Sequence, residues 1–119
     1  MEKMKTRKNK WIYVLGTKYE IIINAPDKML PPGADGAMDH STKKIIIAKF
    51  EPDEYSVKKL NNYRKKVLRH EIVHAFLYES GLWNNSGDIE SWAQSEEITD
   101  WIAIQSPKLF RAFKEADCL

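Results

Sequence analysis

The sequence predicts an α+β fold, in which a small, mainly antiparallel three-stranded sheet packs on a long helix, a second helix and a short C-terminal helix. Three short runs rich in β-branched and aromatic residues come early in the chain, which is typical of strands. After residue 52 the apolar residues recur at spacings of three and four, which is typical of helices. A chain of 119 residues with 43% hydrophobic and 30% charged residues fits one globular domain.

The first two predicted strands form a hairpin. Residues 11–15 and 19–23 are the apolar runs, and Gly16 and Thr17 join them. Glycine adopts a positive φ at little steric cost, and the tight turn of a hairpin requires such a φ. We therefore expect the two strands to pair antiparallel, with Gly16 in the turn.

The stretch over residues 25–36 is expected to be a loop, because it holds three prolines and two glycines. The third strand is predicted at residues 44–48, where three isoleucines follow one another. An edge strand over residues 43–49 could pair with an extended peptide by strand addition.

The second half of the chain is predicted to be helical. One long helix is expected over residues 54–79, with Gly81 ending it, and a second over residues 89–105 after a polar loop. Ser106 and Pro107 suit the N-cap and the first position of a helix, so they predict a break and a short last helix. The tryptophans of this half are expected to be packing residues, namely Trp83, Trp92 and Trp101.

Basic residues gather in two stretches, one at the N-terminus and one in residues 58–69. The formal net charge is only +2, so we expect a solvated tail and a solvated helix face, and nucleic acid is not an expected partner. Residues 1–9 are predicted to be a flexible basic leader, and residues 10–119 a single domain.

Cys118 is the only cysteine, so no intrachain disulfide can form and the fold does not depend on an oxidising compartment. Its place near the chain end argues against a role as metal ligand. No run has the length of a membrane-spanning helix, and no apolar segment follows the basic N-terminus as in a signal peptide. We therefore expect a cytoplasmic protein with no membrane partner.

The residues that indicate chemistry lie in the first predicted helix, where His70, Glu71 and His74 form an HExxH pattern. Helical positions four apart differ by about 40° of rotation, so the two histidines share a face and can bind one Zn²⁺ ion. Glu71 lies about 100° round from His70, which suits a general base acting on a water at the metal. Two of the three histidines in the chain fall at this spacing, which favours zinc binding over a chance pattern.

A catalytic zinc site needs a third protein ligand and an open position. Glu96 lies 22 residues after His74, and an antiparallel helix pair would bring it beside the histidines. Asp100 would lie one turn further on and could accept the outward N–H of a ligating histidine, which fixes the tautomer. Glu97, Glu90 and Asp100 itself are the alternative ligands.

The pattern of HExxH followed by Glu-x-x-x-Asp resembles the gluzincin metallopeptidases. In the segment 95–100 this resemblance implies that Glu96 is the zinc ligand and Asp100 its orienting partner. The segments 15–19, 35–47 and 69–77 resemble the minimal HExxH proteins of phages and other mobile elements, which are related in outline to the ImmA/IrrE antirepressor-cleaving peptidases. The resemblance covers most of residues 10–110 and implies a zincin-like domain.

The gluzincin peptidases also use a histidine or tyrosine from a further segment to stabilise the oxyanion. The spacing singles out none of the available residues here, which are His40, Tyr55, Tyr63 and Tyr78. His40 is otherwise expected to be a surface or strand residue.

Together these features predict a zinc-dependent peptidase, a hydrolase that uses a metal-activated water and Glu71 as its base. Its expected partner is a peptide or protein substrate, such as a regulatory protein in a phage or mobile-element context. The alternative is a non-catalytic module in which zinc holds the helices together and another surface binds a protein.

Overall fold

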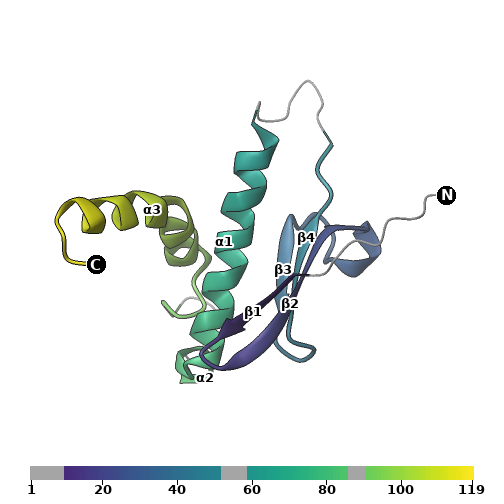
Figure 1. The fold of residues 1–119 in the computed structure, drawn as a ribbon. Helices are drawn as coiled ribbons and strands as arrows, with labels where there is room; N and C mark the ends of the chain where they lie inside the picture. Colours follow the sequence, from purple (N-terminus) through teal and green to yellow (C-terminus); the bar gives the residue numbers. More distant parts are fainter. Residues whose placement is uncertain (1–9, 52–58, 86–90) are drawn as a thin grey trace.

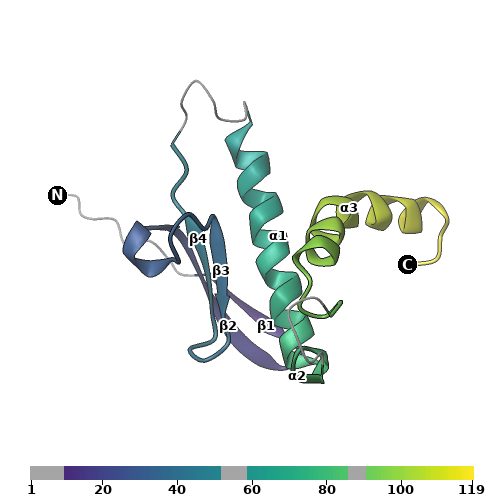
Figure 2. The ribbon, with the colours of Figure 1, turned by 180° about the vertical axis from the view of Figure 1, so that it is seen from behind.

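The computed structural model describes residues 10–51, 59–85 and 91–119, and it has an α+β architecture (Figure 1). The elements in chain order are β1 (Lys10–Val14), β2 (Thr17–Ala25), the short 3-10 helix η1 (Asp27–Met29), β3 (Gly36–Asp39), β4 (Lys44–Ala48), α1 (Leu60–Glu79), α2 (Leu82–Asn85) and α3 (Glu96–Glu115). Helix α1 lies between the sheet and α3, and the same layers are visible from behind in Figure 2. The predicted α+β class is therefore confirmed, while the predicted leader over residues 1–9 lies outside the described residues.

The predicted hairpin is present. Strands β1 and β2 pair antiparallel, with Val14 opposite Thr17 at the turn. Gly16 has a φ of 89°, as its place in the turn requires, and Leu15 beside it also has a positive φ of 49°. Thr17 already belongs to β2, so Leu15 rather than Thr17 completes the turn.

The sheet has four strands, so the prediction of three was wrong. It is mixed, with two antiparallel pairings and one parallel pairing, so the prediction of mainly antiparallel strands agrees with the structure. The strand order is β1-β2-β4-β3, with β2 and β4 parallel and β3 antiparallel to β4. Strand β3 was missed because Gly36, Ala37 and Met38 carry no β-branched side chain. Its pairing with the isoleucine-rich β4 supplies the stability that its own residues lack.

The position of β4 also corrects the predicted edge. The segment 43–49 contains β4, which pairs with β2 on one side and β3 on the other, so it cannot accept a further strand. Among the described strands the two edges are β1 and β3.

One face of the sheet packs on α1. Tyr19 and Ile21 of β2 and Ile45 and Ile47 of β4 are buried in one cluster with Val67 of α1. These strand residues are two positions apart, so their side chains leave the sheet on the same side. The packing fixes which side of α1 meets the sheet, and the HExxH residues lie on that helix.

Helix α1 begins at Leu60, whereas the sequence predicted a start at residue 54. Lys59 is not helical, with φ of −109° and ψ of 78°, and residues 52–58 lie outside the described part of the chain. The predicted end is confirmed, because the helix stops at Glu79 and Gly81 has a φ of 90°.

Glu79 ties the end of α1 to two turns of the sheet. Its carboxylate accepts hydrogen bonds from the Thr17 hydroxyl at 3.1 Å, the Tyr19 hydroxyl at 2.6 Å and Lys43 Nζ at 2.8 Å. The bond from Lys43, and then that from Tyr19, outweighs burial and lowers the pKa of Glu79. The ionised form of this carboxylate therefore stabilises the fold.

The second half of the chain differs more from the prediction. Asn84 and Asn85, expected in a loop, belong to α2, and residues 86–90 lie outside the described residues. Helix α3 begins at Glu96 rather than near residue 89, and the Ser95 hydroxyl accepts a hydrogen bond from the Ile98 N–H as its N-cap.

Helix α3 continues through Pro107 to Glu115, so the predicted break at Ser106 and Pro107 was wrong. A proline has no N–H for the carbonyl four residues before it, which here is that of Ala103. Arg69 Nε of α1 donates to that carbonyl at 2.5 Å instead. The neighbouring helix therefore supplies the missing donor, and the last part of α3 turns away from α1 (Figure 1).

Of the helices in the described ranges, none combines the length and apolar composition that crossing a bilayer requires. Trp92 and Trp101, which were expected to be packing residues, are 54% and 52% exposed, so about half of each residue remains in contact with solvent. Trp101 belongs to α3, whose main neighbour is α1, and Trp92 lies in the segment before that helix.

Candidate functional site

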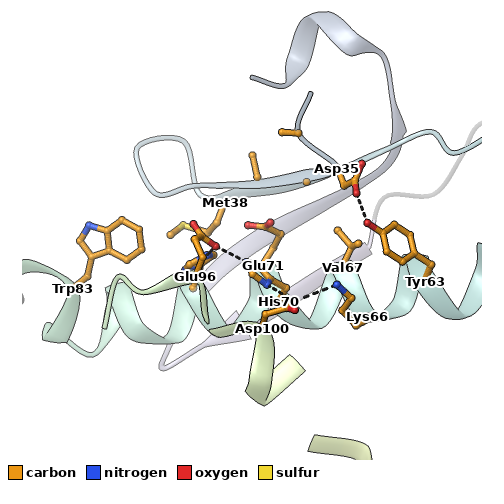
Figure 3. A pocket seen from close by; sticks show the side chains of 14 residues that line it. Asp35, Met38, Tyr63, Lys66, Val67, His70, Glu71, Trp83, Glu96 and Asp100 are labelled. Carbon is orange, nitrogen blue, oxygen red and sulfur yellow. Dashed lines mark hydrogen bonds and ion pairs between the residues drawn. The ribbon is translucent and has the colours of Figure 1, made fainter. Parts of the chain in front are cut away.

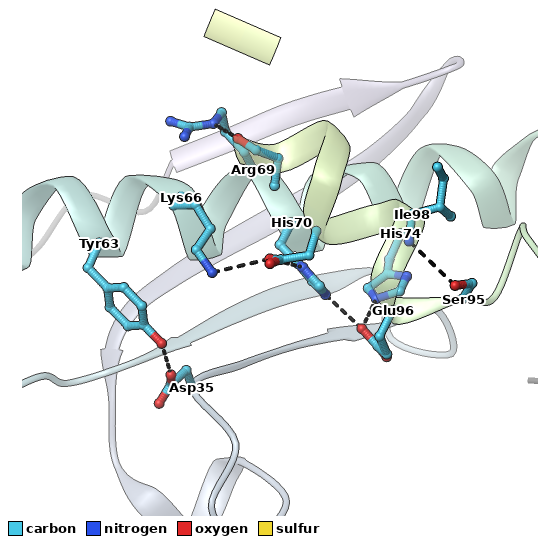
Figure 4. Close-up of polar contacts among 11 residues, drawn as sticks. Asp35, Tyr63, Lys66, Arg69, His70, His74, Ser95, Glu96 and Ile98 are labelled. Atoms are coloured by element: carbon cyan, nitrogen blue, oxygen red, sulfur yellow. Dashed lines mark hydrogen bonds and ion pairs between the residues drawn. The ribbon is translucent and has the colours of Figure 1, made fainter. Parts of the chain in front are cut away.

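Two imidazole rings leave α1 on the same side, as the HExxH spacing predicts. The ring centroids of His70 and His74 lie 4.8 Å apart. His74 is buried, and Trp83 of α2 lies edge-on to its ring at 5.6 Å. The two Nε2 atoms point toward the N-terminal end of α3 (Figure 4).

Glu96, the first residue of α3, meets both rings. Its Oε1 lies 2.8 Å from His70 Nε2 and 3.0 Å from His74 Nε2. These three residues form the one cluster among the described residues whose ligand atoms, all within 4.8 Å of one another, could hold a metal ion. Glu97 is not part of this cluster, and Glu90 lies outside the described residues.

Asp100 lies one turn further along α3 and contacts the other nitrogen of His70. Its Oδ1 is 3.1 Å from His70 Nδ1, and the same oxygen accepts a hydrogen bond from Lys66 Nζ at 3.1 Å. A carboxylate on Nδ1 favours the tautomer that keeps Nε2 free of a proton, which is the form that binds a metal.

The donor set fits a cation. When Nδ1–H is donated to Asp100, a neutral His70 presents the lone pair of Nε2 to a Glu96 oxygen only 2.8 Å away. Two lone pairs at such a distance repel unless a proton or a metal ion lies between them. Two imidazoles and one carboxylate are also a common protein donor set for zinc.

The charges around these residues favour the ligand forms. Burial alone would raise the pKa of Glu96, but the contacts with His74 and His70 outweigh it and lower the pKa. Burial likewise opposes the ionised form of Asp100, and Lys66 and His70 overcome it, so its pKa is lowered. Burial lowers the pKa of His74 despite Glu96, which favours the neutral, metal-binding imidazole.

Glu71 has a different environment from the other carboxylates. It is 7% exposed, and burial raises its pKa to about 7, with His70 acting against the rise and Glu96 adding to it. Strand β3 passes close above it, because a Cβ at Gly36 would lie 2.9 Å from Val67 Cγ1 and 3.2 Å from Glu71 Oε2. A side chain at position 36 would therefore have to displace Val67 or the Glu71 carboxylate, which a glycine avoids.

All these residues line one cavity of about 390 Å³ between α1, β3 and the start of α3. Figure 3 shows Glu71 near the middle of the row, with Trp83 at one end and Tyr63 at the other. The size lies in the range of small-molecule sites.

Three lining residues were not anticipated from the sequence as part of a site, namely Met38, Lys66 and Trp83. Trp83 was expected to be a packing residue, and it lines the cavity. Spacing carried no signal for these residues, because they come from the β3 region, α1 and α2, which only the fold brings together.

The four residues considered for oxyanion stabilisation differ in position. Tyr63 lines the cavity, where its hydroxyl donates to Asp35, and this bond, followed by burial, raises the pKa of Tyr63 to about 12. His40 and Tyr78 instead stack on each other with ring centroids 4.2 Å apart. Tyr55 lies outside the described residues.

Comparison with known proteins adds no relative: no protein-family model, no curated protein and no solved structure matches this chain. The functional conclusion therefore depends on the geometry of the cavity.

Proposed function

We propose that this protein is a zinc-dependent peptidase in which His70, His74 and Glu96 hold the metal and Glu71 is the general base. The observation that carries the proposal is the convergence of two Nε2 atoms and one carboxylate oxygen within 4.8 Å, in a cavity that Glu71 also lines. Asp100 has the role of a positioning residue, since it contacts Nδ1 of His70 and not the cluster itself.

Zinc is the proposed ion because imidazole nitrogen and carboxylate oxygen together suit it, and three protein ligands leave a position for chemistry. When bound, the ion would polarise a carbonyl and lower the pKa of a water.

Glu71 would move the protons of the reaction. It would take one proton from the attacking water as the new C–O bond forms, and pass it to the leaving nitrogen as the C–N bond breaks. Glu71 is thereby regenerated, and the products are a carboxylic acid and an amine. The burial of Glu71 below Gly36 keeps the carboxylate in one place and away from bulk water.

A peptide or protein is the proposed substrate because β3 is both an edge strand and a wall of the cavity. Gly36, Ala37 and Met38 belong to β3 and line the cavity. An extended peptide could hydrogen bond to the outer side of such a strand and so lie beside Glu71. A regulatory protein of a phage or mobile element is the substrate that the sequence resemblance suggests.

The decisive experiment compares the wild type with Glu71→Gln and His74→Ala after zinc loading. We expect Glu71→Gln to keep one zinc per chain and lose peptide cleavage, because a neutral amide cannot accept the proton. His74→Ala should lose both. Cleavage by Glu71→Gln at the wild-type rate would disprove the assignment of the base.

A second candidate is a non-catalytic module in which zinc joins α1 and α3. It is favoured by one observation, namely that α3 packs chiefly on α1 and buries only Thr99 and Ala103. If this is the role, a chelator should lower the unfolding temperature strongly, and the zinc-loaded wild type should cleave no member of a broad peptide library.

A further inference from the structure

A hydrogen bond joins the two walls of the cavity at one end. Asp35, in the segment just before β3, accepts the hydroxyl proton of Tyr63 on α1. Both residues line the cavity, and Figure 3 shows the bond at the end opposite to Trp83. We call this contact the Asp35–Tyr63 bar.

Both ends of the bar are held in place. The Tyr63 ring packs edge-on to Phe50 at 5.3 Å, and Lys66 Nζ lies 5.1 Å from its centroid. On the other side, the Asp35 carbonyl accepts a hydrogen bond from the Ala48 N–H at 2.9 Å, which ties it to the end of β4. The hydroxyl therefore meets a carboxylate whose backbone is fixed to the sheet.

The opposite end of the cavity has a different character. Trp83 and Met38 line it and offer aromatic and thioether surface. Trp83 is held by its carbonyl, which accepts a hydrogen bond from Gln94 Nε2 at 2.9 Å, and by contacts of its ring with His74 and Tyr78. A substrate would thus meet apolar surface on one side of the metal ligands and a hydrogen bond to a carboxylate on the other.

We infer that the Asp35–Tyr63 bar sets substrate specificity by closing one end of the cavity. A peptide bound along β3 has to end, or turn out of the cavity, within a residue or two of the scissile bond on the Tyr63 side. On the Trp83 side it meets an apolar surface that suits a large apolar side chain. This inference rests on the proposed peptidase function, and it adds to it the class of peptide that is cleaved.

The Asp35–Tyr63 bar would limit the length of a bound peptide, because a peptide running past it must break a hydrogen bond to a charged acceptor. Bonds of this kind are stronger than those between neutral groups. The peptide would also have to replace the contact of Lys66 with the Tyr63 ring.

The test uses two series of peptides lengthened from one cleavable core, one toward the N-terminus and one toward the C-terminus. The wild type should lose about tenfold in kcat/KM in one series and not in the other. Tyr63→Phe, which removes the hydroxyl but keeps the ring, should relieve most of that loss, and Asp35→Ala should do the same. Tyr13→Phe, an exposed tyrosine on β1, is the matched control and should keep the asymmetry.

A second readout does not depend on turnover. Calorimetric binding of the same peptides to zinc-loaded Glu71→Gln should show the same one-sided loss, relieved when Tyr63→Phe is added. Equal tolerance in both series, or an asymmetry that neither bar variant changes, would overturn the inference alone. Absence of both binding and cleavage would overturn the proposed function and the inference together.

Discussion

Helices α1 and α3 contribute to the candidate site in different ways. His74 of α1 is 5% exposed, and its helix contacts strands β1, β3 and β4. The Glu96 side chain of α3 is 75% exposed, and its helix packs chiefly on α1. The histidines on α1 thus belong to the core of the domain, whereas Glu96 lies on a helix that docks on that core.

This difference teaches where the site is preorganised. The histidines are positioned by the same packing that stabilises the sheet, so they keep their geometry as long as the domain is folded. Glu96 depends on how α3 docks. Asp100 supports the docking through contacts with Lys66 and His70, each at 3.1 Å, and the Ala103 carbonyl supports it through Arg69 at 2.5 Å. Changes on α3 should therefore have smaller effects than changes on α1.

The largest effect is expected from His74→Ala on zinc affinity. A structural zinc site binds its ion with about 12 kcal/mol, which is about 3 kcal/mol for each of its four ligands. Loss of one ligand should therefore raise the Kd for zinc by about a hundredfold. Competition with a chromophoric chelator measures this value. His40→Ala, which changes the histidine stacked on Tyr78, is the control and should leave Kd unchanged.

Glu96→Gln should weaken zinc binding less than His74→Ala does. A contact with a charged group is worth about 1.5 kcal/mol, so we expect a rise in Kd of about tenfold. Glu97→Gln is the neighbouring control with the same chemistry. If Glu97→Gln had the larger effect, the ligand assignment on α3 would be wrong.

Arg69→Met should loosen α3 without touching a proposed ligand. It leaves the Ala103 carbonyl without a donor, because Pro107 has none, and should destabilise the docking of α3 by about 1–3 kcal/mol. Hydrogen exchange of the α3 amides should become faster, while Lys65→Met, at an exposed position of α1, should change nothing.

A double-mutant cycle with Pro107→Ala sharpens this prediction, because alanine restores the N–H that can serve the Ala103 carbonyl within α3. The effect of Arg69→Met should be smaller in that background. Strictly additive effects would show that the two residues do not share this carbonyl.

The smallest effect is expected at the far end of α1, in the dependence of stability on pH. The pKa of Glu79 is lower in the folded protein than in the unfolded chain, so in acid the unfolded chain binds the proton more readily. Its contribution is present above the unfolded pKa and is lost as the pH falls through the folded value. Glu79→Gln should therefore make the free energy of unfolding fall less steeply as the pH is lowered, and Glu97→Gln should not.

Features that depend only on neighbours in the sequence were predictable. The hairpin at Gly16 requires a positive φ that glycine adopts freely, and the shared face of His70 and His74 follows from the helical repeat. The end of α1 near Gly81 belongs to the same group.

Features that depend on partners distant in the sequence were not predictable from local patterns. Strand β3 forms because β4 pairs with it, and α3 passes Pro107 because Arg69 serves the Ala103 carbonyl. Trp83 was predicted only as a packing residue, since the residue type alone does not distinguish a cavity wall from other packed positions.

The amino-acid sequence alone was sufficient to place the imidazoles of His70 and His74 on one face of a helix, because one helical turn relates them. It left Glu90 and Asp100 open as alternative ligands, and it favoured Glu96 over the adjacent Glu97 without excluding either. The docking of α3 on α1 decided between them, because adjacent helical residues point about 100° apart and only one of them can face the histidines.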